Sequence, residues 1–381
     1  MRYLDEYRLP ETTRAIAEVI AEEVDPSLEY NLMEFCGGHT HAFNRYALYA
    51  LLPESINMIH GPGCPVCVLP AERIDMAMDL ACNSDVIFCT YADMLKVPGS
   101  KPRSSLMSIK GKNTDIRAVY STTDVLDIAK KNTNKQVIFF AIGFETTAPA
   151  TAMLVLLAEE QGIDNILVFN NHVLTPPAMK TILNMDSDGS RASLISGIVG
   201  PAHVATVIGY RDFSSIADAF RIPIVISGFE ASDMMASILM LVRQINQRKH
   251  IVENEYSRGV TLDGNAQAKM YLYRVFVANR EFTWRGLGVL TNSALGFQEK
   301  YKKYDAESFY QLSIPAMQED KRCQCGDVLM GVLQPQQCRI FATACTPSQP
   351  MGPCMVSAEG ACAAHYNYGR FRTEAKVEKR G

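Results

Sequence analysis

Cysteine is the residue type with the greatest chemical potential in this chain. Eleven cysteines occur in two groups, five within residues 36–89 and six within residues 323–362, with none between the groups. An odd cysteine number, behind a start (MRYLDEYRLPETT) that lacks the apolar core of a secretion signal, argues against an extracellular disulfide framework. We therefore expect a cytoplasmic protein. In that reducing compartment, two thiol clusters indicate metal or redox chemistry.

The first cysteine stands in Cys36-Gly37-Gly38-His39, which is expected to follow a strand and open a helix. The free N–H groups and positive partial charge of a helix N-terminus lower a thiol pKa and favour the thiolate. Two glycines permit a tight turn and the close approach of a ligand. The alternative is a buried structural cysteine, but Gly-Gly-His beside it favours a functional thiolate.

The second motif, Cys64-Pro65-Val66-Cys67, has the spacing of redox-active dithiols and also lies between an expected strand and helix. The alternative is half of a zinc site, which is weaker because a second Cys-x-x-Cys or His-x-x-x-His pair is missing. Cys82 and Cys89 are expected to be ordinary buried side chains.

The C-terminal cysteines are unevenly spaced and lack zinc-knuckle pairs. They stand in a Gly- and Pro-rich stretch with little hydrophobic periodicity, and they are Cys323, Cys325, Cys338, Cys345, Cys354 and Cys362. An iron–sulfur cluster takes four thiolates from irregular spacings, which leaves two for a neighbouring redox disulfide. Spacing alone does not tell which four are ligands, and structural zinc remains an alternative.

Two Gly-Phe-Glu turns, containing Glu145 and Glu230, each end an expected strand. Their carboxylates could cap the next helix, or could accept a hydrogen bond or relay protons in a site. His172 and His203 carry the same ambiguity between structural and functional roles.

The length, composition and charge of the chain limit the class of protein in which these motifs occur. A length of 381 residues suggests two or three domains, and 48% apolar residues are typical of a globular protein. The formal net charge of −4 offers no basic footprint for nucleic acid or for an anionic membrane. The longest apolar runs, such as residues 152–158, are far too short for a membrane span.

Short apolar strands alternate with amphipathic helices, which predicts an α/β fold with mostly parallel sheets. The expected strands are Asn31–Phe35, Ile56–His60, Asp85–Cys89, Gln136–Ile142, Asn165–Phe169, Leu194–Val199 and Pro223–Ser227. The expected helices include Thr12–Val24, Pro70–Cys82, Thr123–Lys131, Thr146–Gln161, Ser232–Arg248 and Asn265–Arg280. The Pro-Gly and charge-rich stretches around Lys96–Lys112 are expected to be loops or a linker.

A weak internal echo relates residues 59–65 to residues 198–204. It predicts two similar doubly wound domains, 1–125 and 126–250, that face each other across a cleft. Residues 251–381 would then form a helical and cysteine-rich iron–sulfur region. Ligands in such sheets bind outside the carboxyl ends of the strands, where the unusual residues fall.

Four motifs together resemble the HypD family of hydrogenase maturation factors. They are Phe-Cys-Gly-Gly-His-Thr-His (35–41), Gly-Pro-Gly-Cys-Pro-Val-Cys (61–67), Gly-Phe-Glu-Thr-Thr (143–147) and Cys-Met-Val-Ser-Ala-Glu-Gly-Ala-Cys (354–362). The resemblance runs from about residue 30 to residue 370, with the motifs in the expected order.

The resemblance implies a scaffold that assembles the Fe(CN)2CO unit of nickel–iron hydrogenases together with a small HypC-like chaperone. A HypE-like protein would supply the cyanide. Cys36 would hold the assembling iron with help from His39, and Cys64 and Cys67 would be the exchanging dithiol. Glu145 is a further candidate for proton transfer.

The family resemblance also implies a [4Fe–4S] cluster, in surroundings similar to those of ferredoxin:thioredoxin reductase. By that analogy the ligands are Cys323, Cys338, Cys345 and Cys362, and the redox pair beside them is Cys325 and Cys354. An assembly scaffold with redox activity is therefore expected, rather than a free-standing enzyme. The alternative, an autonomous iron–sulfur thiol–disulfide reductase, leaves Cys36-Gly-Gly-His unexplained.

Overall fold

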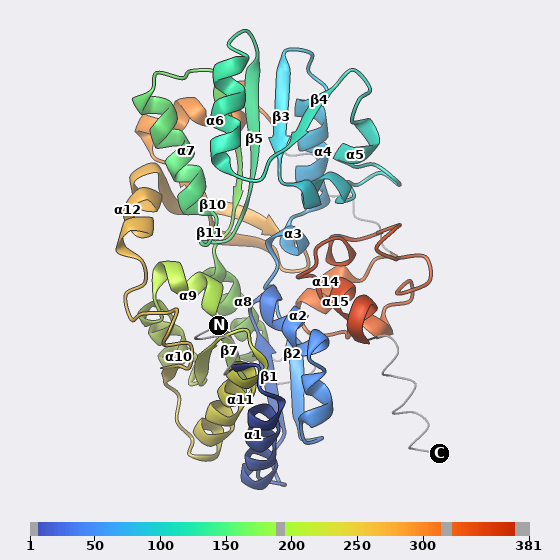
Figure 1. Ribbon diagram of the computed structural model, residues 1–381, viewed down its shortest axis with the longest axis vertical. Coiled ribbons are helices and arrows are strands. Elements are labelled where there is room, and N and C mark those ends of the chain that lie inside the picture. Colours follow the sequence, from blue (N-terminus) through green and yellow to red (C-terminus); the bar gives the residue numbers. More distant parts are fainter. Residues whose placement is uncertain (1–6, 188–194, 314–321, 370–381) are drawn as a thin grey trace.

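Two separate parallel β-sheets organise the chain in this computed structural model, which describes residues 7–187, 195–313 and 322–369 (Figure 1). The sheets lie in two α/β units, and an antiparallel hairpin and a cysteine-rich region complete the described residues. The expected α/β class with parallel sheets in two domains is therefore confirmed.

The first sheet has the strand order β2-β1-β7-β8-β9, and all of its neighbouring strands are parallel. Its strands are β1 (Tyr30–Glu34), β2 (Ile56–His60), β7 (Gly197–Pro201), β8 (Ile224–Ser227) and β9 (Val252–Asn254). The residues of β7 and β8 are all buried, as expected for parallel strands that are covered on both faces.

The second sheet has the order β4-β3-β5-β6 and is also entirely parallel. Its strands are β3 (Val86–Thr90), β4 (Asp115–Ala118), β5 (Gln136–Gly143) and β6 (Ile166–His172). Its central strands are runs of β-branched and aromatic residues, which favours extended backbone and burial on both faces.

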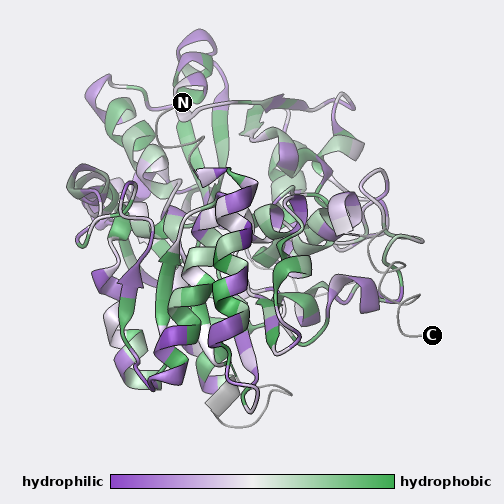
Figure 2. Ribbon diagram, turned by 60° about the horizontal axis from the view of Figure 1, so that its bottom comes forward, coloured by the Kyte–Doolittle hydropathy of each residue, from purple (hydrophilic) through white to green (hydrophobic). Residues whose placement is uncertain are grey.

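Helices connect and cover the strands. Their bounds are α1 (Pro10–Glu23), α2 (Gly37–Arg45), α3 (Pro65–Val68), α4 (Ala71–Ala81), α5 (Leu106–Ile109), α6 (Thr122–Lys131), α7 (Ala148–Glu160), α8 (Thr175–Ser187), α9 (Ala202–Ile208), α10 (Ser214–Phe220), α11 (Ala231–Asn246), α12 (Ala266–Val275), α13 (Ala306–Tyr310), α14 (Cys325–Leu329) and α15 (Ala361–Ala364). Figure 2 shows hydrophobic residues concentrated along the strands and hydrophilic residues on many outer helix turns. Within the described ranges, no helix combines the length and the apolar character that crossing a bilayer requires.

The chain visits the two sheets in an interleaved order. It lays down β1 and β2, builds the whole second sheet from residues 86–172, and then returns to the first sheet with β7, β8 and β9. The expected division at residue 125 does not coincide with this arrangement, because Val125 lies inside α6 of the second unit. Hydrophobic patterns locate strands, but they do not tell which strands pair.

The two segments of the internal echo lie in one sheet, whereas they were expected in two facing domains. Residues 59–65 and 198–204 follow or end β2 and β7, which flank β1 in one sheet rather than lying in facing domains. The expected strand Leu194–Val199 is observed as β7, and Leu194 itself lies outside the described residues.

An antiparallel hairpin of β10 (Phe276–Trp284) and β11 (Gly288–Phe297) occupies part of a segment expected to be helical. The expected helix Asn265–Arg280 ends at Val275, where α12 gives way to β10. The aromatic side chains of Phe276, Phe282 and Trp284 are buried and fit a half-buried strand better than a surface helix.

The cysteine-rich region, residues 322–369, consists of short helices and turns that pack on the N-terminal motifs. Its α14 and its 3-10 turn η7 (Pro353–Met355) contact α3, and α15 contacts α2. Figure 1 shows α14 and α15 beside α2 and α3, near the middle of the molecule.

Candidate functional site

The carboxyl ends of four strands of the first sheet carry the residues of the site. Cys36 follows β1, residues 61–64 follow β2, His203 begins the helix after β7, and Phe229 follows β8. The register places Glu34 of β1 between its partners His60 and Val199, so these strand ends lie level. The structure therefore brings the first two cysteine motifs together at the edge where parallel sheets bind ligands.

Cys36 caps α2 and is only 4% exposed. Its Sγ lies 3.4 Å from Nδ1 of His203. Burial raises the pKa of the Cys36 thiol far above its usual value, and the nearby carboxyl groups of Glu359 and Glu34 add to this rise. The expectation that the helix N-terminus lowers this pKa is wrong for the metal-free protein, because desolvation and the two acids outweigh the backbone N–H groups.

Backbone contacts hold the two motifs against each other. The N–H of Gly37 donates to the carbonyl oxygen of Gly63 at 2.8 Å. A Cβ atom at Gly63 would come within 2.5 Å of the Cys36 nitrogen, so this position requires glycine. The Cys36 loop and the loop before Cys64 are thus packed directly against each other.

His39 is fully buried and contacts β8, which is separated from β1 by β7 in the sheet. Its Nε2 is 2.9 Å from the carbonyl oxygen of Ser227, to which it must donate. Burial lowers the pKa of His39 to about 4, so the ring is neutral and Nδ1 is an acceptor. This Nδ1 has no hydrogen-bond partner among the described residues.

Phe229 lies between two histidines and was not anticipated as a site residue. Its ring stacks on His39 with centroids 4.9 Å apart and on His203 with centroids 4.1 Å apart. A Cβ at Gly38 would lie 2.9 Å from the Phe229 ring, which explains the second glycine of the motif. The second Gly-Phe-Glu turn, which contains Phe229, is the sequence signal that marks this position.

A buried chain of hydrogen bonds lies beneath the Cys36 loop and was also missed. Glu34 accepts the Cys36 N–H at 3.3 Å, its Oε1 is 2.9 Å from His60 Nδ1, and His60 Nε2 is 3.0 Å from His365 Nε2. Burial lowers the pKa of His60 to about 4 and that of His365 to about 3, so both rings are neutral. The chain ties the first motif to the cysteine-rich region.

Cys64 and Cys67 form a disulfide whose Cα atoms are 5.2 Å apart. Cys325 and Cys354 form a second disulfide, with Cα atoms 6.4 Å apart. The first disulfide belongs to α3, and the second joins α14 to η7, both of which contact α3. All four sulfur-bearing residues are buried in one hydrophobic cluster, so the two disulfides are packed into a common core.

All six C-terminal cysteines line a single small pocket. The second disulfide leaves free thiols at Cys323, Cys338, Cys345 and Cys362, the four residues that the family resemblance implies as cluster ligands. Burial raises the pKa of Cys362 well above its usual value, and the charges of the other three would raise it further. Four thiolates at this position would need a cationic centre to offset their mutual repulsion.

The donor chemistry of this pocket fits an iron–sulfur cluster. Four free thiols face one pocket, and in a [4Fe–4S] cluster each thiolate binds a different iron, so the sulfurs need not converge on a point. Across the described part of the chain, no group of three or more His, Cys, Asp or Glu residues is arranged to hold a single metal ion. The cluster itself stays a prediction.

Arg285, in the turn of the β10–β11 hairpin, links α3 to the cysteine pocket. Its backbone N–H donates to Val68 at 2.8 Å and its Nε donates to Leu69 at 3.1 Å, directly after the Cys64–Cys67 motif. Its positive charge also acts on Cys323, although burial still raises the pKa of that thiol to about 11. This buried cation was not apparent from the sequence.

Glu145 lies in the second unit and caps α8. Its Oε1 accepts the Thr175 N–H at 2.9 Å and its Oε2 accepts the Thr175 hydroxyl at 3.0 Å. Burial raises the pKa of Glu145 to about 7. These contacts show a helix cap, and they give no link to Cys36.

The structure gives Glu230, His172 and His203 distinct surroundings. Glu230 is the N-cap residue of α11 and pairs with Arg8 at 2.7 Å, and His172 is buried with its Nε2 2.9 Å from the Thr151 hydroxyl. His203, by contrast, contacts Cys36. The expectation of burial holds for Cys89 and is wrong for Cys82, which is exposed.

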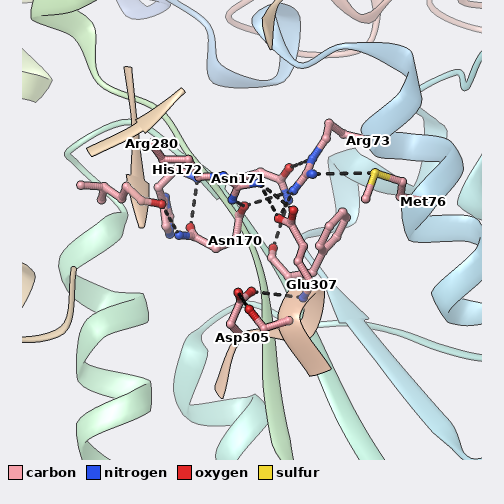
Figure 3. Close-up of polar contacts among 11 residues, drawn as sticks. Arg73, Met76, Asn170, Asn171, His172, Arg280, Asp305 and Glu307 are labelled. Carbon is pink, nitrogen blue, oxygen red and sulfur yellow. Dashed lines mark hydrogen bonds and ion pairs between the residues drawn. The ribbon is translucent and has the colours of Figure 1, made fainter. Parts of the chain in front are cut away.

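A second polar cluster lies at the carboxyl end of β6 (Figure 3). Glu307 binds Arg73 at 2.5 Å and Arg280 at 2.7 Å, and Arg73 also donates to the Asn171 side chain at 2.5 Å. The Arg73 guanidinium lies 4.4 Å from the centroid of Phe169. These contacts fasten α4, β6, the hairpin and α13 together, so the cluster is a structural clamp.

Comparison with known proteins gives matches along nearly the whole chain. The matching family model covers residues 11–369 and is described as the hydrogenase formation hypA family, HypD. Hydrogenase maturation factor HypD2 of Bradyrhizobium diazoefficiens is 51% identical over 373 residues, 98% of each chain. The HypD factors of Cupriavidus necator and Escherichia coli are 48% and 40% identical, over 98% of this chain and 98% and 100% of theirs.

Proposed function

Because the chain belongs to the HypD family of hydrogenase maturation factors, we propose that it is the scaffold on which the Fe(CN)2CO unit of nickel–iron hydrogenases is assembled. The observation that carries the proposal is the gathering of Cys36, His203, His39 and the Cys64–Cys67 disulfide at one edge of the first sheet. A metal-binding thiol beside an exchangeable disulfide is suited to holding iron while its ligands change.

Cys36 is the residue that holds the substrate iron. Low-spin iron with cyanide and carbonyl ligands favours a soft thiolate donor. The thiol carries its proton in the metal-free protein because its pKa is raised, so iron binding must release that proton. His203 Nδ1, at 3.4 Å from Sγ, is placed to accept it.

Neutral histidines and backbone N–H groups complete the surroundings of the iron. Phe229 stacks on both His39 and His203, so an apolar ring helps to hold the His203 imidazole that contacts the thiol. Cyanide carries negative charge, and the Gly38 N–H at the start of α2, which acts on the Cys36 thiol, is a suitable donor for it.

The four free thiols of the cysteine pocket, Cys323, Cys338, Cys345 and Cys362, would hold a [4Fe–4S] cluster. When bound, such a cluster supplies one-electron storage. Once the Cys325–Cys354 disulfide has been reduced to two thiols, these could reduce the Cys64–Cys67 disulfide on the contacting α3 and become a disulfide again, which would link the pocket to the Cys36 loop.

The partners of the assembly are proposed to be a HypC-like chaperone that shares the iron and a HypE-like protein that donates cyanide. Free thiols and exchangeable disulfides are best maintained in a reducing compartment, so we propose the cytoplasm as the site of action. Nothing in the charge balance of −4 favours nucleic acid or membrane as a partner.

The second candidate function is an autonomous iron–sulfur thiol–disulfide reductase, and the contact between the two disulfide-bearing elements favours it. That function would not require Cys36 or the histidines that surround Phe229. We therefore rank it below the scaffold function.

Infrared spectroscopy of the protein purified with its partner in the absence of oxygen tests the proposal. Bands in the cyanide and carbonyl stretching region, lost in Cys36→Ala but kept in Cys82→Ala, would support the scaffold. Cys82 is an exposed cysteine outside the site, so it controls for loss of any thiol. Absence of such bands from the wild-type complex, with disulfide reductase activity retained, would favour the reductase.

A further inference from the structure

A pocket of about 550 Å³ opens between the loop before α5 and the cysteine-rich region. One wall is formed within residues 96–107, and the other by Arg322 and residues within 344–351. The charged side chains that line it are all basic, namely Lys96, Lys101, Arg103 and Arg322. In Figure 1 α5 and the cysteine-rich region lie on the same side of the molecule.

The positive charge of this pocket stands out from the rest of the chain. Residues 95–114 contain five lysines and arginines and no acidic residue, although the whole chain has a net charge of −4. Lys96, Lys101 and Arg103 are exposed, and none of the three is ion-paired with another described residue. Asp75 accepts the Ser100 N–H at 3.1 Å but does not line the pocket. An acidic partner would therefore meet uncompensated positive charge.

The pocket adjoins the cysteine pocket directly. Arg322 and Ala344 line it and precede Cys323 and Cys345 in the chain. Met351, another lining residue, donates its N–H to the Cys345 Sγ at 3.3 Å. A protein seated here would rest against the wall that carries the thiols.

Resting on the proposed function, we propose that this basic pocket is the docking surface for an acidic one-electron carrier protein of the ferredoxin class. A protein surface is favoured over a small anion, because the polar side chains that line the pocket are exposed or half-buried. Solvated cations of this kind steer and orient a charged protein rather than enclose a small ligand.

The electrons from the carrier protein reduce the Cys325–Cys354 disulfide. Two carrier molecules are each oxidised by one electron, two protons are taken up from solvent, the S–S bond breaks, and both cysteines become thiols. The reduced pair can then exchange with the Cys64–Cys67 disulfide on the contacting α3.

The test uses a reduced, acidic plant-type [2Fe–2S] ferredoxin as the probe and the full-length protein prepared without oxygen. Its affinity and the rate at which Cys325 and Cys354 become available to alkylation are measured at low and high salt. The double variant Lys101→Glu/Arg103→Glu should lower both by roughly tenfold or more at low salt, and high salt should abolish the difference. The matched control is Lys130→Glu/Lys131→Glu, which changes the net charge equally on the exposed side of α6.

Equal losses in the two double variants, or no binding of ferredoxin by the wild type, would overturn the proposal. Tight binding of inorganic phosphate in place of ferredoxin would overturn it as well. Dithionite, a small reductant that needs no docking, separates this inference from the proposed function. If dithionite frees both thiols in Lys101→Glu/Arg103→Glu while ferredoxin reduces it as fast as the wild type, only the docking inference fails. If iron and sulfide are absent, the proposed cluster fails, and the affinity measurement still decides the docking inference.

Discussion

Cys36 Sγ and His203 Nδ1 lie 3.4 Å apart, although the two residues are separated by 167 positions in the chain. The contact exists because β7 pairs with β1, which places the start of α9 beside the start of α2. A thiol whose pKa is raised by burial thus has an imidazole next to it.

Replacing His203 should change how Cys36 reacts without unfolding the protein, because His203 is partly exposed to solvent and its ring contacts Phe229 by stacking. We expect His203→Ala to slow alkylation of Cys36 and to weaken iron retention, since the nearest proton acceptor is lost. His203→Gln, which keeps an acceptor, should be less affected. Alkylation rates measured by mass spectrometry would check this, and unchanged rates in His203→Ala would show that the contact is incidental.

The Cys64–Cys67 pair should cycle as a two-electron couple. Titration in graded thiol–disulfide buffers, followed by alkylation in denaturant, should show both residues becoming alkylated together, and Cys64→Ser should leave Cys67 a free thiol at every potential. Cys89, a free cysteine of β3, provides an internal reference that should be alkylated to the same extent at every potential. Independent alkylation of the two residues at every potential would refute a redox role.

Ligand variants should divide the C-terminal cysteines into two classes. Cys338→Ala removes a free thiol of the cysteine pocket and should abolish bound iron and acid-labile sulfide. Cys325→Ala breaks the disulfide and should leave a cluster in place. Anaerobic iron and sulfide analysis is the measurement. Zinc without sulfide in the wild type, or cluster loss only in Cys325→Ala, would contradict the assignment.

Glu307→Gln should destabilise the second unit by roughly 3–5 kcal/mol, because it leaves the buried Arg73 and its neighbour Arg280 without their counter-ion. Glu159→Gln is the matched control, since it breaks the exposed ion pair with Lys300 and should shift the unfolding transition very little. Denaturant unfolding followed by circular dichroism would compare them. Similar shifts for the two variants would mean that the clamp in Figure 3 contributes little.

Glu145 should make stability depend on pH. Its pKa is raised by burial to about 7 in the folded protein, so the folded state binds more protons than the unfolded state between the two pKa values. Stability should therefore fall as pH rises from about 4.5 to about 7, by up to roughly 3 kcal/mol. In Glu145→Gln this fall should be smaller, as judged by thermal midpoints in parallel buffers. An identical pH profile in the variant would show that Glu145 does not titrate in this range.

Local structure around the motifs could be read from the sequence. The expected strand Ile56–His60 coincides with β2, and the strand before Cys36 differs from β1 by one residue at each end. Such strands can be predicted because an apolar run bounded by turn residues is a local sequence pattern. The placement of both motifs at strand ends followed from the same patterns.

Relations between distant segments could not be read in this way. His203 reaches Cys36, and Phe229 reaches His39, only because β7 and β8 join the sheet of β1. In the same way, His365 reaches His60 from the cysteine-rich region. Strand pairing depends on packing of the whole chain, which periodicity does not encode. The same lack of tertiary information explains the error about the Cys36 pKa, since two acids and complete burial became evident only in three dimensions.

The interleaved order of the two sheets also determines when each part of the site is synthesised. Cys36 leaves the ribosome about 190 residues before Phe229, and at roughly 5–20 residues per second this interval is on the order of ten seconds or more. During that time the second sheet can fold on the nascent chain, while the Cys36 and Cys64 loops wait for β7 and β8 to cover them. The nascent chain thus carries uncovered thiols in the Cys36 and Cys64 loops. Most of the chain must be translated before β7 and β8 can shield these thiols from other metals or oxidants.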